Sequence, residues 1–504
     1  MFLIRYIKKS HIRGSMLLSV MVFSAIAITL VSGVVGWTQT TLTLSRRAYY
    51  REQAFQIAEA GIDYYRWHLA HNKNDFQDGT GQPGPYTHDF EDKNGVVIGQ
   101  FILTITPPPV GSTVVVVKSE GVVSAEPTIS RTIQAKLAIP SFAKWAVVAN
   151  DTMRFGEGTE TFGPIHSNGG IRFDGLAHNV VSSTVSSYDD PDHDESGAEK
   201  LEYGVHTHLK PPPQSGSYVQ YVSAEMPPAV PATRSDVFLA GRQFPVAPAD
   251  FTGITANLSQ IKSSAQSGGR YFAASGYQGY RILLKTNDTF DLYRVTNLST
   301  VSNGCGQNQT ANSQDGWGTW SIRANNGQTL LGNYAFPANG LIFVEDNLWV
   351  EGTINTARLT IAAGRFPDNA NTRKSITINN DLKYTNYDGQ DVIALIAQKN
   401  INVGFVSEDD LSIDAALVAQ NGNVGRYYYS SSCSTYYDRN ILRLYGMIAT
   451  NQRYGFAYAN SGGQHVSGYE DRILTYDANL LYAPPPSFPL ASDSYSTISW
   501  EEIE

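Results

Sequence analysis

Acidic and imidazole side chains gather in one stretch of the sequence, residues 188–208. Five carboxylates and His193 fall between Asp189 and Glu195, and His206 and His208 follow as a His-x-His pair. Aspartate-rich loops suit Ca²⁺, and paired imidazoles suit a transition metal. The spacing matches neither an EF-hand, nor the HExxH zinc motif, nor a Ca²⁺-binding nonapeptide repeat. We therefore expect a solvated acidic loop, and we assign no metal and no other cofactor.

Two further groups contain residue types used in catalysis. His166-Ser167-Asn168 carries an imidazole beside a hydroxyl, but we expect its Ser and Asn to bond the local backbone at a corner. Asp409-Asp410 and Asp414 could form a carboxylate pair, as in β-helical polysaccharide-degrading enzymes, although Asp414 lies in an alternating strand pattern. No GxSxG, P-loop or dinucleotide fingerprint occurs. We assign no catalytic residue and expect no enzyme.

The N-terminal region predicts a membrane anchor. Residues 1–13 contain four basic side chains and no acid, and the apolar stretch from Ser15 to Ser45 contains no charge. About 20 apolar residues suffice to span the hydrocarbon core of a bilayer. Short basic flanks stay in the cytoplasm, so the chain beyond Trp37 is expected outside. The apolar run is longer than that of a secretory signal and lacks a small-residue cleavage site at its far end.

The apolar stretch continues into an amphipathic helical pattern. Ala54, Ala58, Gly61 and Tyr65 fall on one helix face. One helix from Ser15 to Leu69 would be about 80 Å long. Small residues let helices approach closely. The residues expected to pack against helices of other subunits are Ser32, Gly33, Gly36, Ala54, Ala58 and Gly61.

This region resembles the N-terminus of PilX-type pilus-assembly proteins, the minor pilin-like subunits of type IV pili. The resemblance covers about 60 of 504 residues, through Arg13-Gly14-Ser15, the apolar run, and QAFQIAEAGI at 53–62. It implies cleavage between Gly14 and Ser15. Major pilins carry a glutamate at the fifth mature position, where this chain has Ser19. An uncleaved signal anchor therefore remains the alternative.

A small α+β head is expected after the helix. Residues 71–94 are polar and rich in turn formers, and three β-branched runs follow between Gly95 and Ile139. A meander of three or four antiparallel strands could pack on residues 50–70. We assign residues 71–140 to a linker and this pilin-like meander.

Beyond Pro140 the sequence repeats a short pattern of apolar residues, an Asn or Gly corner, and an alternating strand. Copies begin near Val147, Pro164, Leu341, Leu395, Leu417 and Met447. Spacings of about 20 to 30 residues are typical of β-solenoid coils, and a β-sandwich is the alternative. This half also resembles uncharacterised bacterial surface families that join a PilX-like helix to a β-helical head. The predicted ranges are 141–184 and 336–482 for coils, 185–335 for an insertion or side domain, and 483–504 for a Pro-rich tail.

Charge and cysteine content limit the remaining functions. With 37 basic and 46 acidic residues the net charge is −9, which disfavours nucleic acid as a partner. Cys305 and Cys433 are the only cysteines, and they could form one disulfide outside the cytoplasm or remain two unpaired thiols.

The sequence thus predicts a mainly β protein on a single-pass inner-membrane helix, with its head outside the cytoplasm, at the cell surface or in a pilus. The expected function is non-enzymatic, in pilus assembly or adhesion. Its expected partners are the membrane, pilin-like subunits or the pilus machinery, and surface polysaccharide. The alternatives are a surface-anchored β-helical carbohydrate-active enzyme and a structural cell-envelope protein.

Overall fold

The computed structural model describes residues 15–108, 112–139, 141–191, 201–212, 222–249, 251–301, 305, 318–433, 435–460, 464–490 and 494–503. Gly14, His193 and the acidic residues Asp192, Asp194 and Glu195 therefore lie outside the described residues. The chain divides into two compact units. Unit 1 comprises Met1–Pro107, Val115–Leu137 and Thr497–Glu504, and unit 2 comprises Pro108–Val114 and Ala138–Ser496.

Unit 1 is built on one long helix, α1 (Ser15–His71, 57 residues), which confirms the predicted continuous helix. At about 1.5 Å per residue it is about 85 Å long. No proline interrupts it. Threonine hydroxyls along its first half, such as those of Thr29 and Thr38, donate to carbonyls four residues earlier. Their polar groups are therefore satisfied within the helix, as a lipid environment requires.

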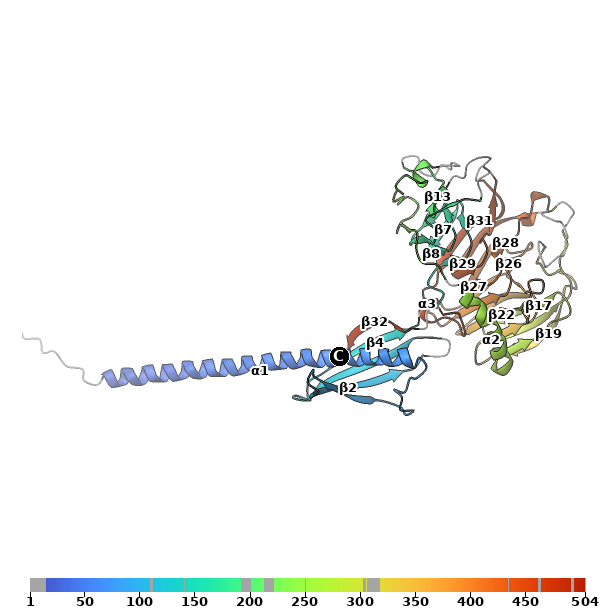
Figure 1. The fold of residues 1–504 in the computed structure, drawn as a ribbon. Helices are drawn as coiled ribbons and strands as arrows, with labels where there is room; N and C mark the ends of the chain where they lie inside the picture. Colours follow the sequence, from blue (N-terminus) through green and yellow to red (C-terminus); the bar gives the residue numbers. More distant parts are fainter. Residues whose placement is uncertain are drawn as a thin grey trace, which may run out of the picture. The chain divides into compact units, whose positions relative to one another are not determined.

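An antiparallel sheet covers the second half of α1 (Figure 1). Its strands are β1 (Tyr86–Glu91), β2 (Val97–Thr106), β3 (Val115–Val123), β4 (Ser130–Ala138) and β32 (Ser496–Ile503), in the order β1-β2-β3-β4-β32. Leu103 and Val117 face the helix side of the core and are fully buried. The predicted helix-plus-meander arrangement is confirmed, and β1 shows that part of the predicted linker is a strand.

The C-terminal tail contributes to both units. In unit 2, Arg358 donates to the carbonyls of Ala483 and Pro484, both at 2.7 Å, so the proline-rich stretch lies along the body as predicted. In unit 1, β32 joins the sheet next to β4, where Glu502 pairs with Arg131. The sequence did not indicate β32, because most of its side chains are polar and exposed rather than alternating.

Unit 2 is mostly sheet. Its helices are α2 (Thr252–Gly268) and α3 (Asn479–Tyr482), with 3₁₀ turns at Ser223–Glu225, Ser431–Cys433 and Thr435–Tyr437. Its strands are β5 (Val147–Ala149), β6 (Met153–Phe155), β7 (Thr159–Phe162), β8 (Ile165–Ser167), β9 (Ile171–Phe173), β10 (Leu176–Ala177), β11 (Val181–Ser183), β12 (Ser187–Asp189), β13 (Leu201–Tyr203), β14 (Val205–His206), β15 (Arg242–Gln243), β16 (Arg270–Phe272), β17 (Gly279–Lys285), β18 (Thr289–Val295), β19 (Gln328–Ala335), β20 (Leu341–Val344), β21 (Leu348–Ile354), β22 (Arg358–Ala363), β23 (Ile376–Thr377), β24 (Leu382–Tyr384), β25 (Val392–Ala397), β26 (Ile401–Val403), β27 (Asp410–Ala419), β28 (Val424–Arg426), β29 (Asp438–Thr450), β30 (Ala457–Ala459) and β31 (His465–Tyr476).

Most of these strands pair in parallel, and their apolar residues stack in register. One ladder runs through β20, β22, β25, β27, β29, β5, β8 and β11. A column of paired, fully buried side chains follows it: Ile342, Ile361, Leu395, Leu417, Ile448, Val147, Ile165 and Val181. Such pairing is unlike that of a sandwich, whose sheets are antiparallel.

The order of strands in this ladder differs from their order in the chain. β5, near the start of unit 2, pairs with β29, near its end. Strands from the predicted insertion at 185–335 also join the parallel ladders, since β15 pairs with β11, β16 with β20 and β17 with β21. These strands of the range therefore belong to the ladders of unit 2 rather than to a separate side domain.

Candidate metal centre

Four buried side chains in unit 2 bring their ligand atoms together. Asp190, Glu202, His206 and His208 each offer one oxygen or nitrogen, and these four atoms lie within 4.8 Å of one another. All four residues are at most 3% exposed. The sequence predicted a solvated loop here. That prediction is wrong for Asp190, His206 and His208, and Asp189 beside them is exposed.

Strand pairing positions these residues. β12 and β13 form an antiparallel pair in which Tyr188 lies opposite Glu202, and Asp190 follows directly after β12. β14 pairs in parallel with β9, with His206 beside Arg172. Residues two apart in an extended chain point to the same side, so Glu202, His206 and His208 can converge.

Several pairs of ligand atoms lie within 4.0 Å of each other. Nε2 of His206 lies 3.2 Å from Nε2 of His208 and 3.7 Å from Oδ2 of Asp190. Nε2 of His208 lies 3.3 Å from Oε1 of Glu202. The distance from His208 Nε2 to Asp190 Oδ2 is 4.0 Å.

A third carboxylate holds the His-x-His segment in place. Asp174, which is buried, accepts a hydrogen bond from the backbone N–H of His208 at 2.7 Å and from the Thr207 hydroxyl at 3.2 Å. Nε of Arg172 donates to its other oxygen at 2.7 Å. Arg172 also lies 3.7 Å from Asp190. These bonds fix the backbone of His208 and the side chain of Arg172 relative to the ligand atoms.

Tyr188 forms one wall of the cluster. Its ring centroid lies 5.5 Å from that of His206. Burial, together with the Asp190 and Glu202 carboxylates, raises the pKa of Tyr188 well above its usual value, so the phenol stays neutral. A methyl group on Gly170 would lie 2.0 Å from the Tyr188 ring, so this glycine makes room for it.

Sequence reasoning missed Glu202, Arg172 and Asp174. A signal for Glu202 was available, because residues 202, 206 and 208 are separated by even numbers and an extended chain would place them on one side, although the structure divides this stretch into β13 and β14. Arg172 and Asp174 could not be found this way, since they reach the cluster through pairing between β9 and β14.

The other candidate catalytic residues have structural contacts. His166 bonds Ser182 and Asn168, at 3.1 and 3.2 Å, and burial lowers its pKa. Ser167 donates to the carbonyl of Asp151 at 2.6 Å. Asn168 also exchanges two hydrogen bonds with the backbone of Ala249. Ser167 also accepts a hydrogen bond from the backbone N–H of Gly169, which is the local bond expected, whereas the backbone partner of Asn168 lies 81 residues away in the sequence.

Asp414 is buried away from Asp409 and Asp410, whose side chains are exposed. It accepts hydrogen bonds from the backbone N–H of Tyr384 at 2.9 Å and the hydroxyl of Tyr387 at 2.7 Å. Burial raises its pKa despite these bonds. Asp409 lies 3.4 Å from Arg439. The structure thus separates the residues of the suggested carboxylate pair.

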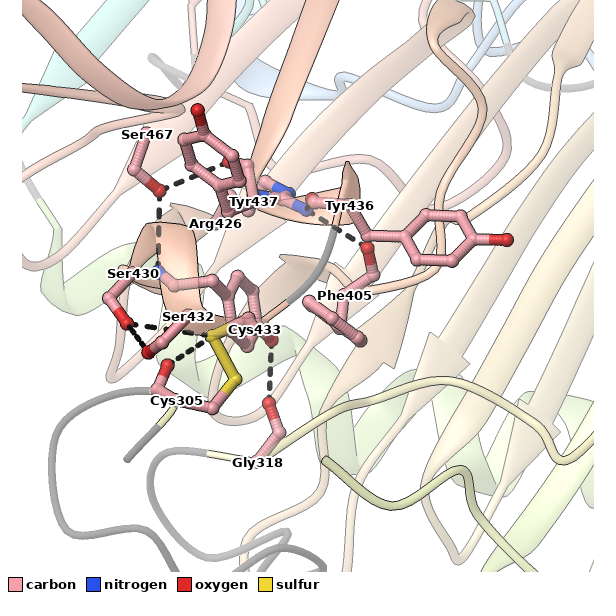
Figure 2. Close-up of a disulfide and its surroundings, with 11 residues drawn as sticks. Cys305, Gly318, Phe405, Arg426, Ser430, Ser432, Cys433, Tyr436, Tyr437 and Ser467 are labelled. Atoms are coloured by element: carbon pink, nitrogen blue, oxygen red, sulfur yellow. Dashed lines mark hydrogen bonds between the residues drawn. A yellow bond between two sulfur atoms is a disulfide. The ribbon is translucent and has the colours of Figure 1, made fainter. Parts of the chain in front are cut away.

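The two cysteines form a disulfide (Figure 2). Cys305 and Cys433 are buried beside Phe405 and Tyr429. The Tyr429 hydroxyl donates to the carbonyl of Gly318 at 2.6 Å, which holds this part of the chain near the disulfide.

The helix-packing residues fall into two groups. Ala54, Ala58 and Gly61 lie against this chain's own sheet: Ala54 and Ala58 are fully buried, and a methyl group on Gly61 would lie 2.2 Å from Ser119 Oγ. They are therefore used within the chain, which corrects their predicted role between subunits. A methyl group on Gly33 or Gly36 would have no neighbour within 4 Å. For Gly33, Gly36 and Ser32, contact with other helices stays a prediction.

No protein-family model matches this chain, and no curated protein does. Among solved structures, the competence-associated pilin ComZ from Thermus thermophilus aligns with 90% of this chain and 98% of its own, at 13% identity and a TM-score of 0.28.

Proposed function

We propose that this chain is a membrane-anchored, pilin-like surface protein that acts without catalysis in pilus assembly or adhesion. The main support for this proposal is that the two halves of α1 have different surroundings. The first half is apolar and uncovered, whereas the second half packs on an antiparallel sheet of its own unit.

The uncovered half has the properties of a membrane span. It is the one helix of the described residues that is long and apolar enough to cross a bilayer. Its side chains include Phe23 at 71% and Leu30 at 65% exposure. Exposing so much apolar surface to water is unfavourable in free energy. We therefore expect this half of the helix to be surrounded by lipid or by other helices.

The covered half supports the head. Ile62, Tyr65 and Leu69 are buried, at helical spacings of three and four residues. Leu103, Val117 and Ile133 of the sheet are buried with them. A helix anchored in this way would hold the head at the membrane surface while its lipid-facing half stays available to other subunits.

We further propose that the ladders of unit 2 are the coils of a β-solenoid. The apolar column from Ile342 to Val181 supports this reading, because stacked coils bury a continuous core of this kind. Such a head would present its outer faces to a partner protein or a surface polysaccharide.

Ser32, Gly33 and Gly36 share one helix face and are expected to contact a neighbouring helix. In membranes of cells that make the pilus system, Gly36→Cys should form a disulfide-linked adduct with a matched cysteine on a pilin-like partner or on a second copy. Val34→Cys, on the opposite face, is the matched control. The native disulfide leaves no other free cysteine in the chain. Equal linking of both variants, or no linking of either, would contradict the proposed face.

A further inference from the structure

We propose that Asp190, Glu202, His206 and His208 bind one first-row transition-metal dication of the Zn²⁺ class. This inference is independent of the proposed function. It rests on four buried ligand side chains that converge on one point.

The distances fit a small tetrahedral ion. Metal–ligand bonds of about 2.0–2.2 Å at tetrahedral angles place ligand atoms about 3.3–3.6 Å apart. The two Nε2 atoms are 3.2 Å apart, Nε2 of His208 is 3.3 Å from Glu202, and Nε2 of His206 is 3.7 Å from Asp190. The 4.0 Å edge between His208 and Asp190 requires only a small inward movement of the carboxylate.

The chemistry of the ligand set selects the class of ion. Two imidazole nitrogens suit zinc and its neighbours, whereas Ca²⁺ and Mg²⁺ prefer oxygen ligands alone. With four protein ligands and no open position required, the arrangement is that of a structural rather than a catalytic site.

The charges of the cluster fit a dication. Asp174, Asp190 and Glu202 bring three carboxylates to the cluster, and Arg172 brings one guanidinium. A dication bound by Nε2 of His206 and Nε2 of His208, which lie 3.2 Å apart, would balance the net charge of these carboxylates and the guanidinium.

The ion would join separate parts of the fold. Asp190 and Glu202 belong to the β12–β13 pair, whereas His206 and His208 lie on and after β14, an edge strand of the sheet β14-β9-β6. Asp174 acts as a positioning residue, because it holds the backbone of His208 from outside the ligand set.

The test uses the full chain in detergent, stripped with a chelator and then titrated with Zn²⁺ or Co²⁺. We expect one Zn²⁺ per chain that survives gel filtration and excess Ca²⁺, and with Co²⁺ the visible absorption of a tetrahedral centre. We also expect a rise of several degrees in the thermal midpoint of unit 2 on adding Zn²⁺. Failure of the stripped wild-type chain to bind Zn²⁺ at micromolar concentration would overturn the proposal.

Variants locate the ion. The pair His206→Ala with His208→Ala should abolish binding, and Asp190→Asn should weaken it at least tenfold. Asp189→Asn, at the exposed neighbouring position, and His178→Ala, outside the cluster, should bind as wild type does. Zn²⁺ retained by the double variant would place it elsewhere. Should the double variant fail to fold, the wild-type titration and Asp190→Asn decide.

Discussion

Replacing Gly121 with alanine is expected to separate α1 from its sheet. Gly121 lies on β3, where an added methyl group would come within 2.0 Å of the Ala54 carbonyl oxygen and 2.6 Å of the Ala58 nitrogen. Both are backbone atoms of α1, so no change of rotamer relieves the clash. Overpacking of this kind costs about 1–3 kcal/mol or more, and we expect the upper end because a helix must move.

Hydrogen exchange measured by mass spectrometry would report this effect, with faster exchange across residues 54–69 of the full chain in detergent. Gly36→Ala is the matched control, since the added methyl group there meets nothing within 4 Å and alanine favours the helix. Exchange in Gly121→Ala that equals wild type would mean that α1 does not approach β3 this closely.

The second large effect is expected from Cys433→Ser. The disulfide closes a loop of 128 residues within unit 2. On the chain-entropy account, losing a cross-link of this length costs about 4–5 kcal/mol of the free energy of unfolding. Urea unfolding of unit 2 should therefore shift to lower denaturant in the variant and in reduced wild type.

The pair Cys305→Ser with Cys433→Ser serves as the control, because both changes remove the same bond. The double variant should unfold like Cys433→Ser, and reductant should affect neither. A reduced wild-type chain with an unchanged midpoint would show that the loop is held by its other contacts.

The sequence predicted those elements whose signal is local. A charge-free apolar run followed by a helical pattern gave α1, and alternating β-branched residues gave β2 to β4. The helical pattern showed that Ala54, Ala58 and Gly61 share a face, but it could not name what covers that face. The structure supplies β3 of the same chain.

The pairing of strands that are distant in the sequence could not be predicted. Repeated corners near Leu395 and Leu417 indicated neighbouring strands, but no local pattern reveals that β5 pairs with β29. The metal cluster depends on the same kind of information. The polarity of residues 188–208 predicts solvent exposure, whereas the register of β12 with β13 and of β14 with β9 places the ligands inside.

The most direct test of a pilin-like subunit is the mature N-terminus. Intact mass and N-terminal sequencing would be compared between cells with and without a prepilin peptidase. We expect a chain that begins at Ser15 when the peptidase is present and at Met1 when it is absent. A chain that begins at Met1 in both would contradict processing as a pilin and leave a signal-anchored surface protein.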